Sequence, residues 1–169
     1  MNTTLYDWNQ ASPGEAITAL ISCCAAERWA AGVAALRPLA SEDELFSASD
    51  RVWDTMQESD WMQAFRAHPR IGDRKPAHAS AQSTAWSKQE QAATTSAQTN
   101  ILAELAEGNQ RYEELFGFTY IVCATGKSAE EMLAILKRRL SSDRQTELCE
   151  AAEQQRQITQ IRLRKWLQA

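Results

Sequence analysis

The sequence is poor in residues that interrupt helices. Its 169 residues include six glycines and four prolines, whereas alanine, glutamate, glutamine, leucine and arginine are frequent. Alanine and long unbranched side chains lose little conformational freedom in a helix, so this composition favours helices over sheets. We therefore predict an all-α fold.

No repeat, low-complexity stretch or linker divides the chain, and its length suits one compact domain. Six tryptophans provide large apolar surfaces for a core. We expect a single-domain helical bundle over residues 1–169. Residues 118–123 (Phe-Thr-Tyr-Ile-Val-Cys) form the one strand-like run. Since one strand cannot form a sheet, we expect a buried extended segment that crosses the helical core.

The sequence has neither an excess of positive charge nor a long apolar run. Its formal net charge is −4 and its pI is about 5.3. The basic residues between positions 156 and 165 are interrupted by uncharged ones, which is typical of a solvated helix face. We expect no nucleic-acid partner and no membrane segment. With no secretory leader and no peroxisomal tripeptide in the sequence, we expect a cytoplasmic protein.

The four cysteines and two histidines lack the spacing of a metal site. The cysteines form no C-x-x-C pair, and His68 and His78 are not spaced as H-x-x-x-H. The chain also lacks the G-x-S-x-G, P-loop and G-x-G-x-x-G motifs of serine hydrolases and nucleotide-binding proteins. We therefore expect reduced thiols, no metal and no cofactor.

Helix-capping signals divide the chain into elements. A serine followed three residues later by a glutamate, the capping-box pattern, occurs at Ser41–Glu44, Ser87–Glu90 and Ser128–Glu131. The second box predicts a long helix from residue 87 to residue 112, with Gly108 as an irregularity. Residues 70–84, before this helix, have no helical pattern and predict an ordered loop.

A single histidine lies at a predicted helix end. A helix capped by Asp60 should stop at His68, because Pro69 disfavours helical geometry in the residue before it. The His68 side chain would then be able to face a cleft. The closing helix is predicted from about Asp143 to Trp166.

The residues that could carry chemistry all have structural alternatives. A histidine before a proline is commonly a hydrogen-bonded helix terminator. Ser87 and Glu90 would form a capping box. Arg162, on a helix with apolar faces, could extend its charged group to solvent or pair with a carboxylate. From their spacing alone, His68, Ser87, Glu90, Gln91 and Arg162 are compatible with an acid/base site or with purely structural roles.

Several motifs resemble one family. Residues 67–73 (Ala-His-Pro-Arg-Ile-Gly-Asp) and 87–92 (Ser-Lys-Gln-Glu-Gln-Ala) resemble the signature of 2-oxo-4-hydroxy-4-carboxy-5-ureidoimidazoline (OHCU) decarboxylases. Further similar stretches are Arg28-Trp29 with Arg37-Pro38, residues 116–128, and residues 158–163. The resemblance covers nearly the whole chain in order. It is weak over residues 74–85, so His78 is assigned a loop role.

The resemblance implies a cofactor-free decarboxylase that produces (S)-allantoin and CO2 during urate breakdown. It implies a small anionic ureidoimidazoline substrate and a homodimer. It places His68 and Glu90 in catalysis. It places the following residues in substrate binding: Pro69, Ser87, Gln91, Phe118, Ile121, Val122 and Arg162.

The implied substrate carries a hydroxyl and a carboxylate on one carbon, beside a C=N bond. That bond can accept the electron pair released with CO2, which explains why no cofactor is needed. An imidazole titrates near pH ~6.5, so His68 suits exchange of the hydroxyl proton, and Glu90 would orient His68 or pass a proton. Arg162 offers a fork of donors for substrate oxygens. Ser87 and Gln91, expected in the first turn of a helix, would favour an anion.

Two alternatives remain open. The chain could be a non-enzymatic helical interaction module, in which the motifs are caps and helix ends. It could also be a decarboxylase of a related ureido acid, because residues 70–85 could change the choice of substrate.

Overall fold

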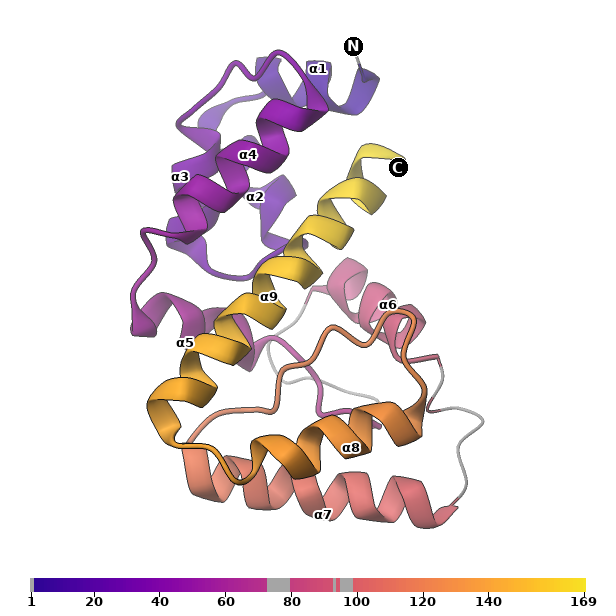
Figure 1. The fold of residues 1–169 in the computed structure, drawn as a ribbon. Helices are drawn as coiled ribbons and strands as arrows, with labels where there is room; N and C mark the ends of the chain where they lie inside the picture. The colour runs from indigo at the N-terminus through magenta and orange to yellow at the C-terminus, as the bar shows by residue number, and fades with distance from the viewer. Residues whose placement is uncertain (1, 73–79, 93, 95–98) are drawn as a thin grey trace. The chain divides into compact units, whose positions relative to one another are not determined.

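The computed structural model describes residues 2–72, 80–92, 94 and 99–169. These residues form nine helices and no strand (Figure 1), which confirms the predicted all-α class. The chain divides into two compact units, the first comprising Met1–Ala64 and Arg156–Ala169 and the second Phe65–Gln155. The single domain over residues 1–169 stays a prediction.

The first unit contains four complete helices and shares two others with the second unit. Consecutive helices α1 to α4 pack against one another. The four helices are α1 (Thr3–Gln10), α2 (Pro13–Ile21), α3 (Glu27–Ala34) and α4 (Glu42–Trp53). The shared helices are α5 (Glu58–Arg66) and α9 (Arg144–Leu167), and the second unit adds α6 (Ala81–Glu90), α7 (Thr99–Phe116) and α8 (Ala129–Arg139).

Several predicted helix starts are confirmed. Pro13 occupies the first position of α2, where its missing N–H leaves no donor unsatisfied. Ser41 caps α4, and Ser128 forms a complete capping box with Glu131 at α8. The predicted cap at Asp60 is wrong, because α5 begins at Glu58 and Asp60 lies in its first turn, where the carboxylate accepts from the backbone N–H of Gln57.

The predicted capping box at Ser87 is wrong. Helix α6 begins at Ala81 and is capped by Ser80, so Ser87 lies in its last turn and Gln91 is its C-cap. The loop predicted over residues 70–84 is also too long, because residues 81–84 are helical. Residues 73–79 of this predicted loop lie outside the described part of the chain. A serine–glutamate pair at this spacing is a local signal, and the helix-forming residues before Ser87 had already begun the helix.

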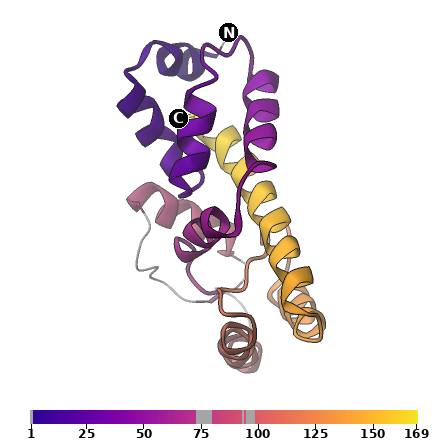
Figure 2. The ribbon, with the colours of Figure 1, turned by 90° about the vertical axis from the view of Figure 1, so that its left-hand side faces the viewer.

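Helices α7 and α8 lie side by side in the second unit (Figures 1 and 2). Gly108 in α7 allows this approach, because a Cβ atom at this position would lie 2.6 Å from Cδ2 of Leu136 in α8. Helix α7 is continuous through this glycine, so the predicted irregularity at Gly108 is wrong. The glycine is a packing feature.

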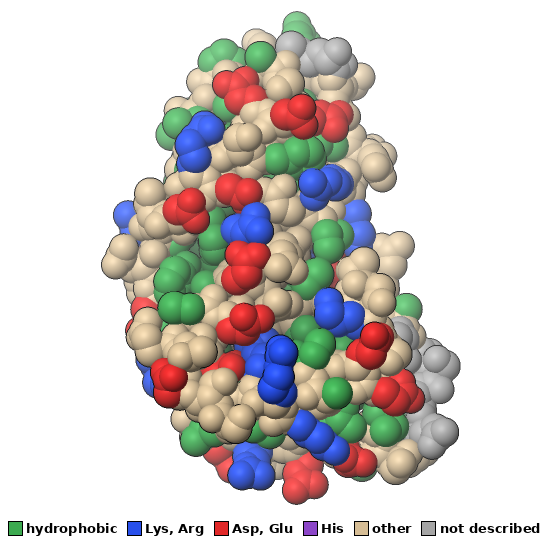
Figure 3. All heavy atoms as spheres, viewed as in Figure 1, with side chains coloured by type: hydrophobic (Ala, Val, Ile, Leu, Met, Phe, Trp, Pro, Cys, Tyr) green, Lys and Arg blue, Asp and Glu red, His purple; other side chains and the backbone are tan. Residues whose placement is uncertain are grey.

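Surface charges of both signs are interspersed on the face shown in Figure 3. No helix in the described part of the chain combines the length and the apolar character needed to cross a membrane. The mixed pattern is that of an ordinary solvated helical surface.

A buried segment without helical structure follows α7, as predicted. Residues 117–128 connect α7 to α8, and Phe118, Tyr120, Ile121 and Val122 are among the buried residues of this segment. Backbone groups in such a segment need hydrogen-bond partners, because burial without them costs free energy. Side chains of the surrounding helices supply partners for Ile121 and Cys123, and Lys127 of the segment itself binds the carbonyl oxygens of Cys123 and Ala124.

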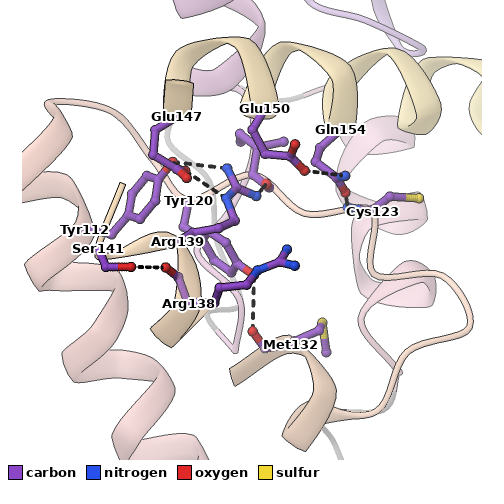
Figure 4. A network of polar contacts seen from close by, with 11 residues as sticks. Tyr112, Tyr120, Cys123, Met132, Arg138, Arg139, Ser141, Glu147, Glu150 and Gln154 are labelled. Carbon is purple, nitrogen blue, oxygen red and sulfur yellow. Dashed lines mark hydrogen bonds and ion pairs between the residues drawn. The ribbon is translucent and has the colours of Figure 1, made fainter. Parts of the chain in front are cut away.

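The central partner is Arg139 of α8 (Figure 4). Its Nη1 donates to the carbonyl oxygen of Ile121 at 2.7 Å, and its Nε donates to Glu147 at 2.8 Å. The Tyr112 hydroxyl accepts from Arg139 Nη2 and donates to Glu147. The Arg139 and Glu147 side chains are 3% and 1% exposed. Burial also raises the pKa of Tyr112, which keeps its hydroxyl protonated and able to donate.

We predict that Arg139→Met destabilises the protein by about 3–5 kcal/mol, because it leaves the Glu147 carboxylate buried without its cation. The free energy of unfolding in urea measures this effect. Lys137→Met provides the control, since Lys137 pairs with Glu104 on the exposed side of the same helix. The control should lose less than about 1 kcal/mol. Equal losses in the two variants would contradict the structural role of Arg139.

The cysteines differ in exposure. Cys23, Cys24 and Cys123 are buried, Cys149 is exposed, and all four are free thiols. Burial raises the pKa of Cys24 to about 11 and raises the pKa of Cys23 further. Because the thiolate is the reactive form, the buried thiols should react slowly.

We predict that one thiol per native chain reacts rapidly with a disulfide reagent, and that Cys149→Ser removes this reaction. All four thiols should react in denaturant, which calibrates the count. Rapid reaction of two or more thiols in the native protein would show that the buried cysteines are accessible.

Candidate functional site

All but one of the predicted site residues belong to the second unit. Arg162 is the exception, because it lies on the part of α9 that belongs to the first unit. The residues in the second unit are His68, Pro69, Ser87, Glu90, Gln91, Phe118, Ile121 and Val122. They come from the end of α5, the end of α6 and the buried segment before α8.

His68 lies just beyond the end of α5, as predicted. Its backbone N–H donates to the Phe65 carbonyl oxygen at 3.0 Å, and Pro69, which is buried, follows it. The half-buried imidazole places Nε2 2.7 Å from Oε1 of Gln155. The histidine is therefore both a helix terminator and a positioned ring, and the first role does not exclude the second.

Gln155 is a residue that the sequence reasoning missed. It lies on α9 and is 1% exposed. Its neighbours at helical spacing, Ala151, Ala152 and Ile158, are also buried. A glutamine inside a stripe of apolar residues is a signal that could have identified it, because a buried amide needs a polar partner.

The end of α6 carries Ser87, Glu90 and Gln91. Ser87 is buried, whereas Glu90 and Gln91 are half-buried. The Gln91 side-chain oxygen accepts from the backbone N–H of Gly72 at 3.1 Å. Gly72 has φ +92°, a conformation that favours glycine. This hydrogen bond brings the segment after His68 to the end of α6, so the two parts of the signature meet.

The expected anion site at the first turn of this helix is wrong. Ser87 and Gln91 lie at the C-terminal end of α6, where carbonyl groups rather than N–H groups are left without helical partners. The helix dipole is negative at this end. Any hydrogen bond from these residues to an anion must therefore come from their side chains.

The buried segment packs against the helix end that leads to His68. The rings of Phe118 and Phe65 have centroids 5.5 Å apart. The carbonyl oxygen of Ile121 is already bound to Arg139, and the N–H of Cys123 donates to Gln154 at 2.8 Å. These bonds hold the backbone of the segment from α8 and α9.

Glu90 acts electrostatically on this segment. Burial raises the pKa of the Cys123 thiol, and the Glu90 carboxylate adds to the rise. The second unit thus combines an imidazole, a carboxylate and buried hydrogen-bonding groups, a set that suits proton transfer.

Arg162 is buried in the first unit, with 2% of its surface exposed. Burial raises the pKa of Cys23 and Cys24, and the positive charge of Arg162 opposes that rise. This burial rules out the structural alternative in which the guanidinium extends into solvent. A buried guanidinium needs oxygen partners, which makes it a suitable group for binding carboxylates or carbonyls.

Metal ligands do not gather in the described residues, where no group of three or more His, Cys, Asp or Glu side chains could hold an ion. His78 lies outside the described part of the chain.

Comparison with known proteins bears on these motifs. The family model described as OHCU decarboxylase matches residues 9–164. The chain is 37% identical over 146 residues to the uric acid degradation bifunctional protein TTL of Arabidopsis thaliana, covering 85% of this chain and 44% of that protein. It is 30% identical over 132 residues to the 2-oxo-4-hydroxy-4-carboxy-5-ureidoimidazoline decarboxylase of Haloferax volcanii, covering 75% of this chain and 73% of that one.

A solved structure agrees in fold. A crystal structure of an OHCU decarboxylase in the presence of (S)-allantoin matches with a TM-score of 0.76 and 31% sequence identity, covering 88% of this chain and 96% of that one. The family model and this structure both extend over most of the chain. The chain belongs to the OHCU decarboxylase family.

Proposed function

We propose that the protein is a carboxy-lyase that converts OHCU to (S)-allantoin and CO2 in urate degradation. The observation that carries this proposal is the hydrogen bond between Gly72 and Gln91. It joins the segment that follows His68 to the helix end that carries Ser87 and Glu90, which supports a single site built from both parts of the signature. The match to the family model over residues 9–164 supports the same reaction.

The proposed reaction breaks the bond between the hydroxyl-bearing carbon and its carboxylate. The electron pair of that bond forms a C=C bond to the neighbouring carbon, and the C=N electrons move to nitrogen, which gains a proton. The hydroxyl then loses its proton to become a carbonyl, and the neighbouring carbon gains one. Starting from the carboxylate anion, the overall change takes up one proton and releases CO2. The substrate supplies its own electron sink, so the proposed reaction needs no cofactor.

The proposed catalytic residues are His68 and Glu90. His68 exchanges the hydroxyl proton, a role that suits an imidazole because its ordinary pKa is near neutral pH. Glu90 orients His68 or passes a proton to or from it, and the two side chains act as one acid/base unit. Delivery of the proton to one face of the neighbouring carbon would produce a single enantiomer.

The proposed binding residues hold a small anion. Arg162 binds the carboxylate or the carbonyl oxygens through its planar fork of donors, and its burial supports this role. Ser87 and Gln91 donate hydrogen bonds from their side chains to the ring and ureido groups. The remaining proposed contacts are Pro69, Phe118, Ile121 and Val122. We further propose a cytoplasmic homodimer without nucleic-acid or membrane partners.

The direct test is an assay with OHCU generated in place. Urate and the enzymes of the two preceding steps supply the unstable substrate, the protein is added, and circular dichroism follows the product. Rapid formation of one allantoin enantiomer is expected. Slow racemic product, equal to that of a control without the protein, would reject the function. A parallel reaction with a related ureido acid tests the choice of substrate.

We predict that His68→Asn lowers kcat by at least about 10²-fold, the lower range for general acid–base catalysis, while the protein stays folded. The OHCU assay measures kcat, and far-ultraviolet circular dichroism checks the fold. His78→Asn is the matched control and should keep its activity. Retention of more than about a tenth of the turnover by His68→Asn would exclude His68 as the main proton carrier.

We predict that Arg162→Lys mainly raises KM, because an ammonium group cannot reproduce the two-donor geometry of a guanidinium. Substrate titration in the same assay measures KM. Arg164→Lys is the control, since Arg164 is exposed on the same helix. Equal KM values in the wild type and Arg162→Lys would remove Arg162 from the binding site.

A further inference from the structure

We infer that Gln155 is a positioning residue that fixes the tautomer and the orientation of His68, so that Nδ1 is the ring nitrogen that exchanges a proton with the substrate. This inference deepens the proposed function and rests on it for the catalytic consequence. The contact itself belongs to the second unit and can be tested without any reaction.

The contact is short and is made across the fold. The 2.7 Å between His68 Nε2 and Gln155 Oε1 joins residues 87 positions apart in the chain. This distance is at the short end of the range for N–H···O hydrogen bonds. Because Gln155 is 1% exposed, the packing around it restricts the positions available to its amide. Because the Gln155 oxygen is held in place, the hydrogen bond to it also limits the orientation of the His68 ring.

The buried amide of Gln155 needs hydrogen-bond partners inside the protein. Ala151, Ala152 and Ile158, together with the polar Thr159, are buried at helical spacing from it on α9. Burying an amide costs free energy unless hydrogen bonds compensate, and an imidazole nitrogen supplies such a bond. The contact with His68 gives the buried amide of Gln155 such a hydrogen bond.

The same turn of α9 also holds the buried segment. Gln154, next to Gln155, accepts through Oε1 from the N–H of Cys123 at 2.8 Å and donates to Glu150 (Figure 4). Two adjacent glutamines thus hold two proposed parts of the site, the histidine and the segment that contains Ile121 and Val122. This turn of α9 acts as a common support for both.

The chemistry of an amide oxygen determines the tautomer. The oxygen only accepts, so the ring must carry its hydrogen on Nε2, which leaves the lone pair on Nδ1. In this tautomer a proton taken from a substrate hydroxyl binds Nδ1. Loss of the acceptor would allow the ring to rotate and to populate the other tautomer, in which the lone pair is on Nε2.

Nitrogen-15 NMR of the imidazole tests the contact directly, because the two tautomers differ in the shifts of their ring nitrogens. The chain has two histidines, so His78→Asn assigns the remaining signals to His68. We expect the neutral wild-type ring to be protonated at Nε2. A neutral ring protonated mainly at Nδ1 would overturn the inference without any variant of Gln155.

Variants test the catalytic consequence. Gln155→Met keeps the size of the side chain but removes the acceptor, and it should reduce the population protonated at Nε2. It should lower kcat on the order of 10-fold to 100-fold, the scale of losses from misplaced groups, with little change in KM. Gln155→Glu keeps an acceptor at this position and should therefore keep the Nε2–H signal seen in the wild type. Gln154→Met is the matched control and should leave the nitrogen signals of His68 unchanged.

The outcomes separate the two proposals. If Gln155→Met changes the tautomer but the wild type does not turn over OHCU, the proposed function fails and the contact stands. If the wild type turns over OHCU and Gln155→Met retains its kcat, Gln155 is not a positioning residue. Should Gln155→Met fail to fold, the wild-type tautomer and Gln155→Glu decide the question.

Discussion

The hydrogen bond from Arg139 to the carbonyl oxygen of Ile121 satisfies the main physical constraint on the second unit, which is that buried backbone outside a helix must have partners. Residues 117–128 form neither a helix nor a sheet, so regular backbone pairing does not satisfy them, although the N–H of Lys127 donates to the carbonyl oxygen of Ala124. The guanidinium of Arg139 can be buried there because Glu147 and the Tyr112 hydroxyl accept its other hydrogen bonds. The placement of the buried segment therefore depends on charged and polar side chains within an apolar core.

The same principle extends to the proposed site. Gln91 binds the N–H of Gly72, and Gln154 binds the N–H of Cys123. Each side chain holds a stretch of backbone that has no helical partner, and each stretch adjoins a proposed site residue. Rigid helices with polar side chains directed at non-helical backbone thus position the site. The direction of the helix dipole also matters. Helix α6 contributes its C-terminal end, which carries partial negative charge, so anion binding at this end depends on side chains.

Local sequence signals predicted the elements with uneven success. Ser41 and Ser128 cap helices because no stronger start precedes them within a few residues. Ser87 has the same spacing to a glutamate, yet it lies in the last turn of a helix that Ser80 caps. A capping box lowers the free energy of a helix start by a modest amount, so a helix already propagating from an earlier cap passes through it. Gly108 shows the converse, because a residue expected to disturb a helix instead leaves room for Leu136 where α7 and α8 approach.

The sequence by itself determined the helical class, the buried segment, the helix exit at His68 and the motifs of the family, because composition, periodicity and short spacings encode local structure. Only the tertiary structure decided that Gln155 binds the imidazole, that Arg139 holds Ile121, and that Ser87 and Gln91 lie at the end of their helix. Hydrogen bonds between residues far apart in the chain depend on how helices pack, and packing leaves no fixed spacing in the sequence. Gln155 illustrates the difference, since its burial is visible in the pattern of α9 while its partner is not.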